Sequence, residues 1–249
     1  MLLENKVAVI YGGGLISGAV AQAFSREGAR IFLAGRNLTR LDQVASAVRA
    51  KGGTIDTAVV DAFDEQAVNH YVDAVVAQAG QIDISFNMIG VGDVQQPLME
   101  ITVADFLQPI VNTMRAHFIT GRAAARHMIE RGSGVILAFG GGGPQTQPGL
   151  GGFKISLDAL EGLRRQWACE LGAHGIRVVT LKTGGIVETL DDDFPNRSEM
   201  IAGLAQATLL KRSATLADVG NVAAFAASDH ARTITSTEIN ISAGAIVDG

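Results

Sequence analysis

Short strand-like runs alternate with longer helical patterns along the whole chain, and this rhythm most constrains the fold. The strand-like runs cover residues 7–11, 30–35, 54–60, 83–87, 134–139, 177–181 and 237–242. The segments between them, such as AVAQAFSREG, carry apolar residues at spacings of three and four, which is typical of amphipathic helices. Crossovers of this length make successive strands parallel and place helices on both faces of the sheet. The sequence therefore predicts an α/β fold, a doubly wound sheet of about seven parallel strands.

The chain shows no sign of a second domain or of a macromolecular partner of opposite charge. No linker, repeat or low-complexity tract interrupts the pattern, so we predict a single domain over residues 1–249. The net charge of -5, with no Lys/Arg-rich run, argues against nucleic-acid binding. No stretch reaches membrane-spanning length without polar residues, and the single cysteine, Cys169, excludes an intrachain disulfide. We expect a soluble, cytoplasmic protein, and the mean hydropathy of +0.25 favours a homo-oligomer with buried apolar helix faces.

The first strand runs directly into a glycine turn that is suited to binding phosphate. Three glycines precede a helix that we expect to begin at about Leu15. Glycines allow backbone amides to approach a pyrophosphate, and the start of a helix attracts the same negative charge. A tight turn without a ligand is the alternative. We predict that a dinucleotide contacts Gly12, Gly13, Gly14, Leu15 and Ile16.

The ends of the second and third strands suggest how the adenosine half of such a ligand is bound. Arg36 follows the second strand, where a guanidinium could bind a ribose 2′-phosphate and no carboxylate is present for a free 2′-hydroxyl. This favours NADP, with NAD possible, although Arg36 could also be a solvated surface charge. Asp61, which precedes Ala62 at the end of the third strand, could accept a hydrogen bond from an adenine amino group. An aspartate that only forms a turn is the alternative.

Several motifs together resemble the short-chain dehydrogenase/reductase family. They are the Gly12 turn, SREGARIFLAGRN, Asp61, IDISFNMIG around Asn87 and Gly90, Asn112, CELGAHGIRVV and ITSTEINISAG. The resemblance covers nearly the whole chain. It implies a Rossmann domain with seven strands, a nicotinamide cofactor near Asn87, Gly90 and Gly184, and tetramers built on the fourth and fifth helices.

The resemblance fails at the residues that carry the family's chemistry. These are an Asn, a Ser that orients the carbonyl, a Tyr that transfers the proton, and a Lys that lowers the pKa of the Tyr. When the chain is aligned on CELGAHGIRVV, the tyrosine position falls on Phe153, the lysine position on Leu157 and the serine position on Gly140. Asn112 alone is retained. The comparison implies a divergent member without the usual proton transfer.

Three other residues are candidate substitutes for the lost proton donor. Lys154 follows Phe153 directly, but one step along a helix turns its side chain by about 100°, and a solvated lysine on the helix surface is the alternative. Tyr11 ends the first strand beside the expected cofactor, but its phenol fits packing or capping of the turn better. Lys182 ends the sixth strand, where the family usually has a small residue near the nicotinamide. Burial could lower the pKa of Lys182 into a catalytically useful range, whereas a lysine that extends to solvent is the alternative. The histidines show no metal-ligand spacing, so no metal is predicted.

The glycine turn also departs from the family pattern. Aligned on SREGA, it is one residue shorter than Gly-x-x-x-Gly-x-Gly, and Leu15 and Ser17 take the later glycine positions. Aligned from Gly12, Ile16 replaces the middle glycine and Gly18 keeps the last. In either alignment a side chain stands where backbone would approach the phosphates.

Three functions remain open on these residues. The first is an NADP-dependent oxidoreductase acting on a small carbonyl or alcohol, with atypical or weak catalysis. The second is a pseudoenzyme that binds a nucleotide or supports a partner without catalysis. The third is cofactor-independent acid/base chemistry by Lys182 or Glu188, next to the acidic loop that contains Asp191, Asp192 and Asp193.

Overall fold

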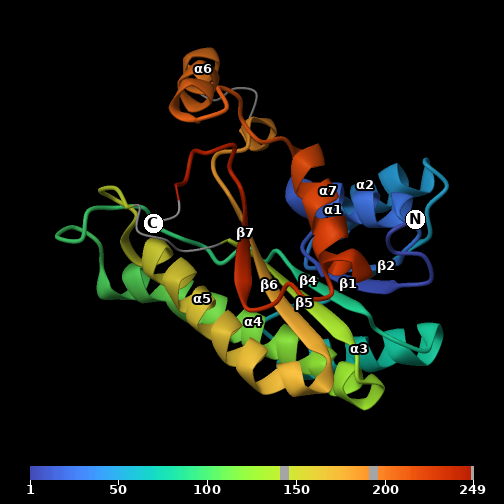
Figure 1. Cartoon of the computed structure of the whole chain (residues 1–249). Helices are drawn as coiled ribbons and strands as arrows, with labels where there is room; N and C mark the ends of the chain where they lie inside the picture. The colour runs from blue at the N-terminus through green and yellow to red at the C-terminus, as the bar shows by residue number, and fades with distance from the viewer. Residues whose placement is uncertain (141–145, 191–195, 248–249) are drawn as a thin grey trace.

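A parallel sheet forms the centre of the molecule in the computed structural model, which describes residues 1–140, 146–190 and 196–247. Within these residues the sheet has seven strands in the order β3-β2-β1-β4-β5-β6-β7 (Figure 1). The strands are β1 Val7–Tyr11, β2 Arg30–Gly35, β3 Ile55–Val59, β4 Ile84–Asn87, β5 Gly134–Gly140, β6 Ile176–Thr183 and β7 Thr237–Ile241. The order reverses between β1 and β4, which creates a crevice at the carboxyl ends of these strands. The predicted fold class is confirmed.

Helices cover both faces of the sheet (Figure 1). They are α1 Leu15–Arg26, α2 Leu38–Arg49, α3 Glu65–Ala79, α4 Val103–Arg131, α5 Gly151–Leu171, α6 Arg197–Ala207 and α7 Leu216–Ala227, with short 3₁₀ helices η1 Gly172–His174, η2 Val187–Thr189 and η3 Asp229–Ala231. One core lies under α1, α2 and α7, and a second lies under α3, α4 and α5. None of the described helices is both long and apolar enough to cross a membrane.

Alternating side chains of the central strands fill the two cores. In β1 every residue is buried: Ala8 and Ile10 face the core under α1, while Val9 and Tyr11 face the core under α3. Strands that are covered on both faces are apolar along their whole length, which explains why VAVIY does not alternate between apolar and polar residues.

A close contact between α1 and α7 fixes the helix that follows the glycine turn. A Cβ added to Gly220 would lie 2.9 Å from both the Ala19 carbonyl oxygen and the Ala23 Cβ. Only glycine permits this approach without displacing one of the helices. The start of α1 is thereby positioned by a helix near the other end of the chain.

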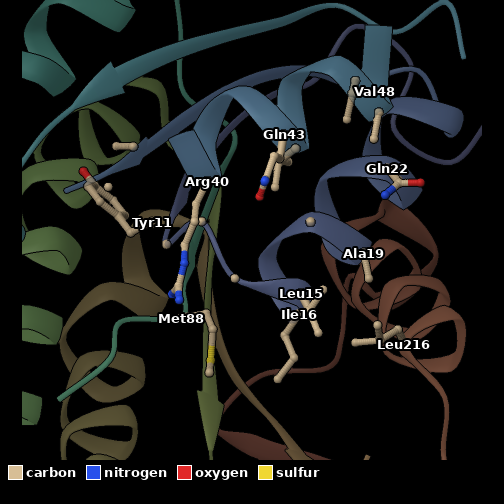
Figure 2. Close-up of a pocket in the computed structure, with 18 of the residues that line it drawn as sticks. Tyr11, Leu15, Ile16, Ala19, Gln22, Arg40, Gln43, Val48, Met88 and Leu216 are labelled. Carbon is tan, nitrogen blue, oxygen red and sulfur yellow. The ribbon is translucent and has the colours of Figure 1, made fainter. Parts of the chain in front are cut away.

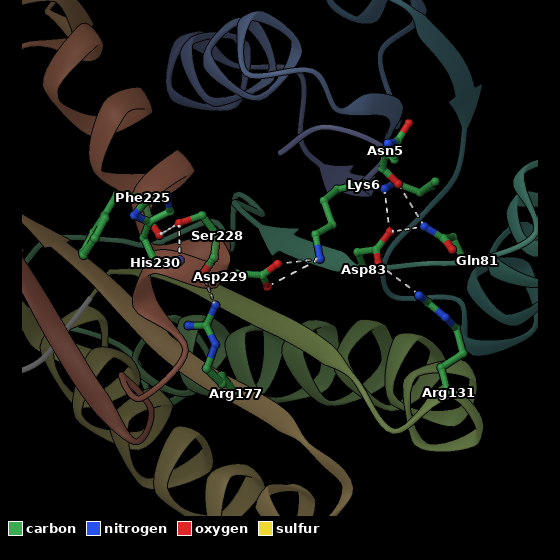
Figure 3. Close-up of polar contacts among 11 residues, drawn as sticks. Asn5, Lys6, Gln81, Asp83, Arg131, Arg177, Phe225, Ser228, Asp229 and His230 are labelled. Atoms are coloured by element: carbon green, nitrogen blue, oxygen red, sulfur yellow. Dashed lines mark hydrogen bonds and ion pairs between the residues drawn. The ribbon is translucent and has the colours of Figure 1, made fainter. Parts of the chain in front are cut away.

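Polar contacts hold together the edge of the sheet where the strands begin (Figure 3). The Asp83 carboxylate accepts hydrogen bonds from the Val7 N–H at 2.7 Å and Gln81 Nε2 at 2.7 Å. It also forms an ion pair with Arg131 Nη1 at 3.0 Å. Arg177 donates to the Ser228 carbonyl oxygen at 3.1 Å. The Asp83 contacts tie the amino ends of β1 and β4 together, and the Arg177 contact ties the amino end of β6 to the end of α7. All of them lie at the edge opposite the carboxyl ends of the strands.

Candidate functional site

A pocket of about 1460 Å³ lies at the carboxyl ends of β1, β2 and β4, beside α1 and α2 (Figure 2). Typical ligand pockets measure roughly 300–1,000 Å³, so this one has room for a ligand as large as a dinucleotide. Its lining includes these residues that the sequence predicted to contact a cofactor: Gly12, Gly13, Gly14, Leu15, Ile16, Arg36, Asp61, Ala62 and Gly90. The fold therefore brings the predicted turn and the predicted strand ends together.

The first and last glycines of the turn have different surroundings. Gly12 has φ +111°, and a Cβ there would lie 2.1 Å from the Met88 carbonyl oxygen, so the position requires glycine. Gly14 is the N-cap of α1 with an extended backbone, and a Cβ there would meet nothing within 4 Å. Open space for a ligand therefore lies directly over Gly14.

Backbone donors without acceptors are concentrated at this turn. The N–H groups of residues 13–17 donate to no described acceptor, and the first bond of α1 is from the Gly18 N–H to the Gly14 carbonyl oxygen at 2.9 Å. Among the described residues, no side chain caps α1, and the buried Ser17 Oγ has no hydrogen-bond partner. Free N–H groups and the positive end of the helix dipole favour an anion. The residues present therefore fit the diphosphate of a dinucleotide.

Leu15 and Ile16 lie at the edge of this open space. Leu15 is 58% exposed, and Ile16 packs partly against the core under α1. Both side chains extend away from α2 (Figure 2). The space directly over Gly14 therefore stays open, and neither side chain fills it.

Arg36 and Asp61 lie on the β2 and β3 side of the pocket. The Arg36 guanidinium lies 5.7 Å from the centre of the Phe63 ring. Asp61 Oδ1 accepts a hydrogen bond from the Phe63 N–H at 3.0 Å, as in a turn stabilised by an aspartate. The turn interpretation of Asp61 thus describes this geometry, and its contact with adenine stays a prediction.

Two of the predicted cofactor residues are not among those that line the pocket. Asn87 is 1% exposed, and its Oδ1 accepts a hydrogen bond from Ser85 Oγ at 3.4 Å. A Cβ added to Gly184 would lie 2.9 Å from the Ala245 Cβ. Both residues lie beside or beneath the crevice, and their cofactor contacts stay predictions.

An apolar contact joins the end of β5 to α5 at two of the three positions that the sequence aligned with the family's catalytic residues. A Cβ added to Gly140 would lie 3.0 Å from Leu157 Cδ2. Phe153 lies in the first turn of α5, one turn before Leu157. None of these side chains can transfer a proton. Residues 141–145, which follow Gly140, lie outside the described residues.

Asn112 and Lys182, the predicted catalytic residues, both have partners in the structure. Asn112 Nδ2 donates to the Val91 carbonyl oxygen at 2.8 Å and so anchors the segment between β4 and α4. Lys182 is 1% exposed, and its Nζ lies 2.7 Å from Glu238 Oε1 on β7. Because Lys182 pairs in register with Gly140, its side chain enters the face of the sheet that α5 covers. Neither residue lines the pocket, and their catalytic roles stay predictions.

The other candidate acids and bases also have structural partners. Glu188 Oε2 accepts a hydrogen bond from the Leu216 N–H at 2.9 Å, at the start of α7. Tyr11 packs edge-on against Tyr71 with ring centres 6.3 Å apart, and burial raises the pKa of its phenol. The acidic residues 191–193 lie outside the described residues. Among the described residues, no group of three His, Cys, Asp or Glu side chains could hold a metal ion.

Comparison with known proteins assigns the chain to a family. Residues 15–245 match the model of a family described as Enoyl-(Acyl carrier protein) reductase. Gluconate 5-dehydrogenase of Gluconobacter oxydans (strain 621H) is 30% identical over 210 residues, which cover 84% of this chain and 82% of that protein. The chain belongs to the short-chain dehydrogenase/reductase family. Members of this family are NAD(P)-dependent oxidoreductases that act on alcohol or carbonyl groups.

One further relative agrees with this assignment to the short-chain dehydrogenases/reductases, and one solved structure shares the fold. Levodione reductase of Leifsonia aquatica is 29% identical over 252 residues, covering 96% of this chain and 94% of that protein. The crystal structure of NAD⁺-bound xylitol dehydrogenase has a TM-score of 0.87 at 24% identity, covering 97% of this chain and 99% of that one. The latter likeness shows the shared fold.

The pocket of this short-chain dehydrogenase/reductase also contains residues that sequence reasoning missed, among them Arg40, Phe63, Met88 and Thr189. Arg40 could have been found, because Asn37 is a favoured N-cap and its side chain accepts from the Arg40 N–H at 3.0 Å. Locating that cap places Arg40 in the first turn of α2, beside the glycine turn. Thr189 reaches the pocket from η2, and no local pattern indicated this.

Proposed function

We propose that the protein is an NADP-dependent oxidoreductase, with residues 1–249 as one dinucleotide-binding domain and a small carbonyl or alcohol as substrate. The observation that carries the proposal is the set of backbone N–H groups of residues 13–17, which have no described acceptor, at a turn whose residues 12–16 line a pocket of dinucleotide size. When bound, the nicotinamide cofactor supplies the hydride chemistry. The glycine turn holds its phosphates, and Arg36 favours a 2′-phosphate.

Turnover should be slow, because the usual proton donor is missing. Gly140, Phe153 and Leu157 occupy the positions aligned with the family's Ser, Tyr and Lys. General acid catalysis contributes about 10²- to 10⁴-fold, so hydride transfer can persist weakly through positioning alone. In this proposal Asn112 shapes the site through the β4–α4 segment, and Lys182 is the buried group to test as a displaced acid.

A non-catalytic dinucleotide-binding protein is the second candidate function. The specific observation in its favour is the apolar contact between β5 and α5, where Leu157 packs against Gly140. This contact leaves nothing at those positions that could transfer a proton. Dinucleotide binding itself is unaffected by the loss.

One experiment separates the two candidates. Purified protein is titrated with NADPH, binding is followed by nicotinamide fluorescence, and oxidation is followed by absorbance over a panel of small ketones and aldehydes. Levodione and keto acids derived from gluconate belong in the panel, because two relatives are named for such compounds. We expect tight binding and slow oxidation with at least one substrate.

The controls decide between the remaining outcomes. Binding of NADPH without any oxidation would favour the non-catalytic function, and the absence of binding would refute both candidate functions.

A variant tests the role of Lys182. Lys182→Met should reduce a detected activity if Lys182 is the displaced acid. Unchanged activity in that variant would leave positioning as the only source of catalysis.

A further inference from the structure

The positively charged side chains of the pocket are of two kinds: some form hydrogen bonds with other described side chains, and some do not. The described lining residues with a positive charge are Arg26, Arg36, Arg40 and Lys51. Arg26 Nη2 donates to Asn221 Oδ1 at 2.7 Å, and Lys51 Nζ donates to Gln22 Oε1 at 2.6 Å. The guanidinium groups of Arg36 and Arg40 form no hydrogen bond or ion pair with any described residue. These two arginines are therefore available to an anionic ligand.

The two available arginines lie at different places along the pocket. Arg36 extends from the end of β2 toward Phe63, which follows β3. Arg40 projects from the first turn of α2 and extends toward Met88, at the end of β4 (Figure 2). A Cβ added to Gly13 would lie 3.2 Å from the Arg40 Cβ. The Arg40 side chain thus starts beside the glycine turn and extends toward the end of β4, whereas Arg36 extends toward Phe63 after β3.

The negative side chains of the pocket do not neutralise Arg40. Among the described lining residues, Asp61 and Glu188 carry negative charge. Asp61 accepts the Phe63 N–H and Glu188 accepts the Leu216 N–H. Their carboxylates help to fix backbone turns, and neither forms an ion pair with an arginine of the pocket.

We propose that Arg40 binds the diphosphate of the dinucleotide, while Arg36 binds the 2′-phosphate. The inference rests on the proposed function and assigns a residue that the family's glycine motif does not contain. In either alignment with that motif, a larger side chain replaces at least one of its later glycines, so the diphosphate has less access to the backbone there. A guanidinium compensates, because its planar set of N–H donors binds two phosphate oxygens at once.

The two assignments predict different patterns of affinity. The diphosphate is common to NAD⁺, NADP⁺ and ADP, whereas the 2′-phosphate occurs only in NADP⁺. Calorimetric titrations of Arg40→Ala in a phosphate-free buffer should therefore show NAD⁺ and NADP⁺ weakened by the same factor, about tenfold or more, as expected for a charge-assisted hydrogen bond. ADP should weaken in parallel. Arg36→Ala should weaken NADP⁺ alone.

Matched variants control for charge and folding. Arg26→Ala removes a cation from the same pocket, but one that is already paired, and should change neither affinity. Arg40→Lys keeps the charge without the planar donor set and should fall between wild type and Arg40→Ala. Thermal unfolding of each variant confirms that it is folded, and truncation of the Arg40 side chain leaves its backbone hydrogen bond to Asn37 in place.

Other outcomes overturn the proposal in distinguishable ways. If Arg40→Ala weakens NADP⁺ alone, Arg40 contacts the 2′-phosphate and the diphosphate assignment is wrong. If both affinities are unchanged while wild type binds, this inference fails and the proposed function stands. If wild type binds neither dinucleotide, both fail together.

Discussion

Two glycines of the turn after β1 have different roles. Gly12 is required by the fold, whereas Gly14 leaves space for a ligand. The carbonyl oxygen of Met88 occupies the space that a side chain at Gly12 would need. Above Gly14 there is only open pocket. The two positions can therefore be separated by substitution.

We expect Gly12→Ala to lower the free energy of unfolding by more than about 2 kcal/mol, because it adds a clash to an unfavourable positive φ. Gly14→Ala should cost about 1 kcal/mol or less, the usual difference between these residues at an N-cap. It should still weaken NADP⁺ binding, since its methyl group enters the space for phosphate. Urea unfolding and calorimetric titration measure the two effects. Equal destabilisation by both variants would contradict the geometry.

His117 on α4 makes stability depend on pH. It is 6% exposed, and burial lowers its pKa from 6.5 to about 4. The unfolded chain therefore binds a proton near pH 6.5, whereas the folded protein does so only near pH 4. The contribution of His117 to the free energy of unfolding is therefore fully present above pH 6.5. It is lost as pH falls toward 4, which lowers the free energy of unfolding by roughly 3 kcal/mol.

Replacing this imidazole tests the pH dependence. His117→Phe should flatten the curve of unfolding free energy between pH 6.5 and 4, because the variant has no proton to bind there. Urea unfolding at several pH values, compared with wild type, removes the shared contribution of the carboxylates. Parallel curves for the two proteins would show that His117 titrates normally.

Among the elements, the strands were the most predictable part of the fold. Each predicted run coincides with an observed strand within two residues at either end. The central strands are continuously apolar because both of their faces are covered, whereas the edge strands β3 and β7 are only partly buried and mix polar with apolar residues. The glycine turn and the end of β2 also followed from the sequence, since the carboxyl ends of parallel strands meet at one edge. Their cofactor contacts are still to be tested.

Side-chain partners set by tertiary packing were not predictable. The carboxylate beside Lys182 comes from Glu238, and only the register of β6 against β7 brings the two together. Glu188 lies in the pocket but is bonded to the start of α7, which is remote in sequence. The direction of Arg40 depends on where α2 begins relative to α1. Such contacts carry no local signal that periodicity could detect.

For the molecule as a whole, α4 presents an apolar surface that its own sheet does not cover. Val103, Leu107 and Val111 recur every four residues on this helix and are 76%, 44% and 55% exposed. Side chains at this spacing lie on one face. Together with the family assignment, this stripe supports the homo-oligomer expected from the mean hydropathy.

We expect sedimentation to show a dimer or a tetramer, and the double variant Leu107→Glu/Val111→Glu to sediment as a smaller species. Charge on an apolar contact surface must be desolvated, which opposes association. Leu38→Glu, at an exposed position on α2, is the matched control and should leave the assembly intact. Wild-type protein that sediments as a monomer would contradict the expectation.

The contact of Gly220 with Ala19 and Ala23 has a consequence for the order of events during synthesis. On the ribosome, α1 is made well before α7, the helix that covers its flank. The flank of α1 that packs on α7 therefore stays exposed until α7 has been made, and exposed apolar surface of this kind is what chaperones protect. The glycine turn is thus anchored firmly only when a helix made much later in synthesis packs against α1.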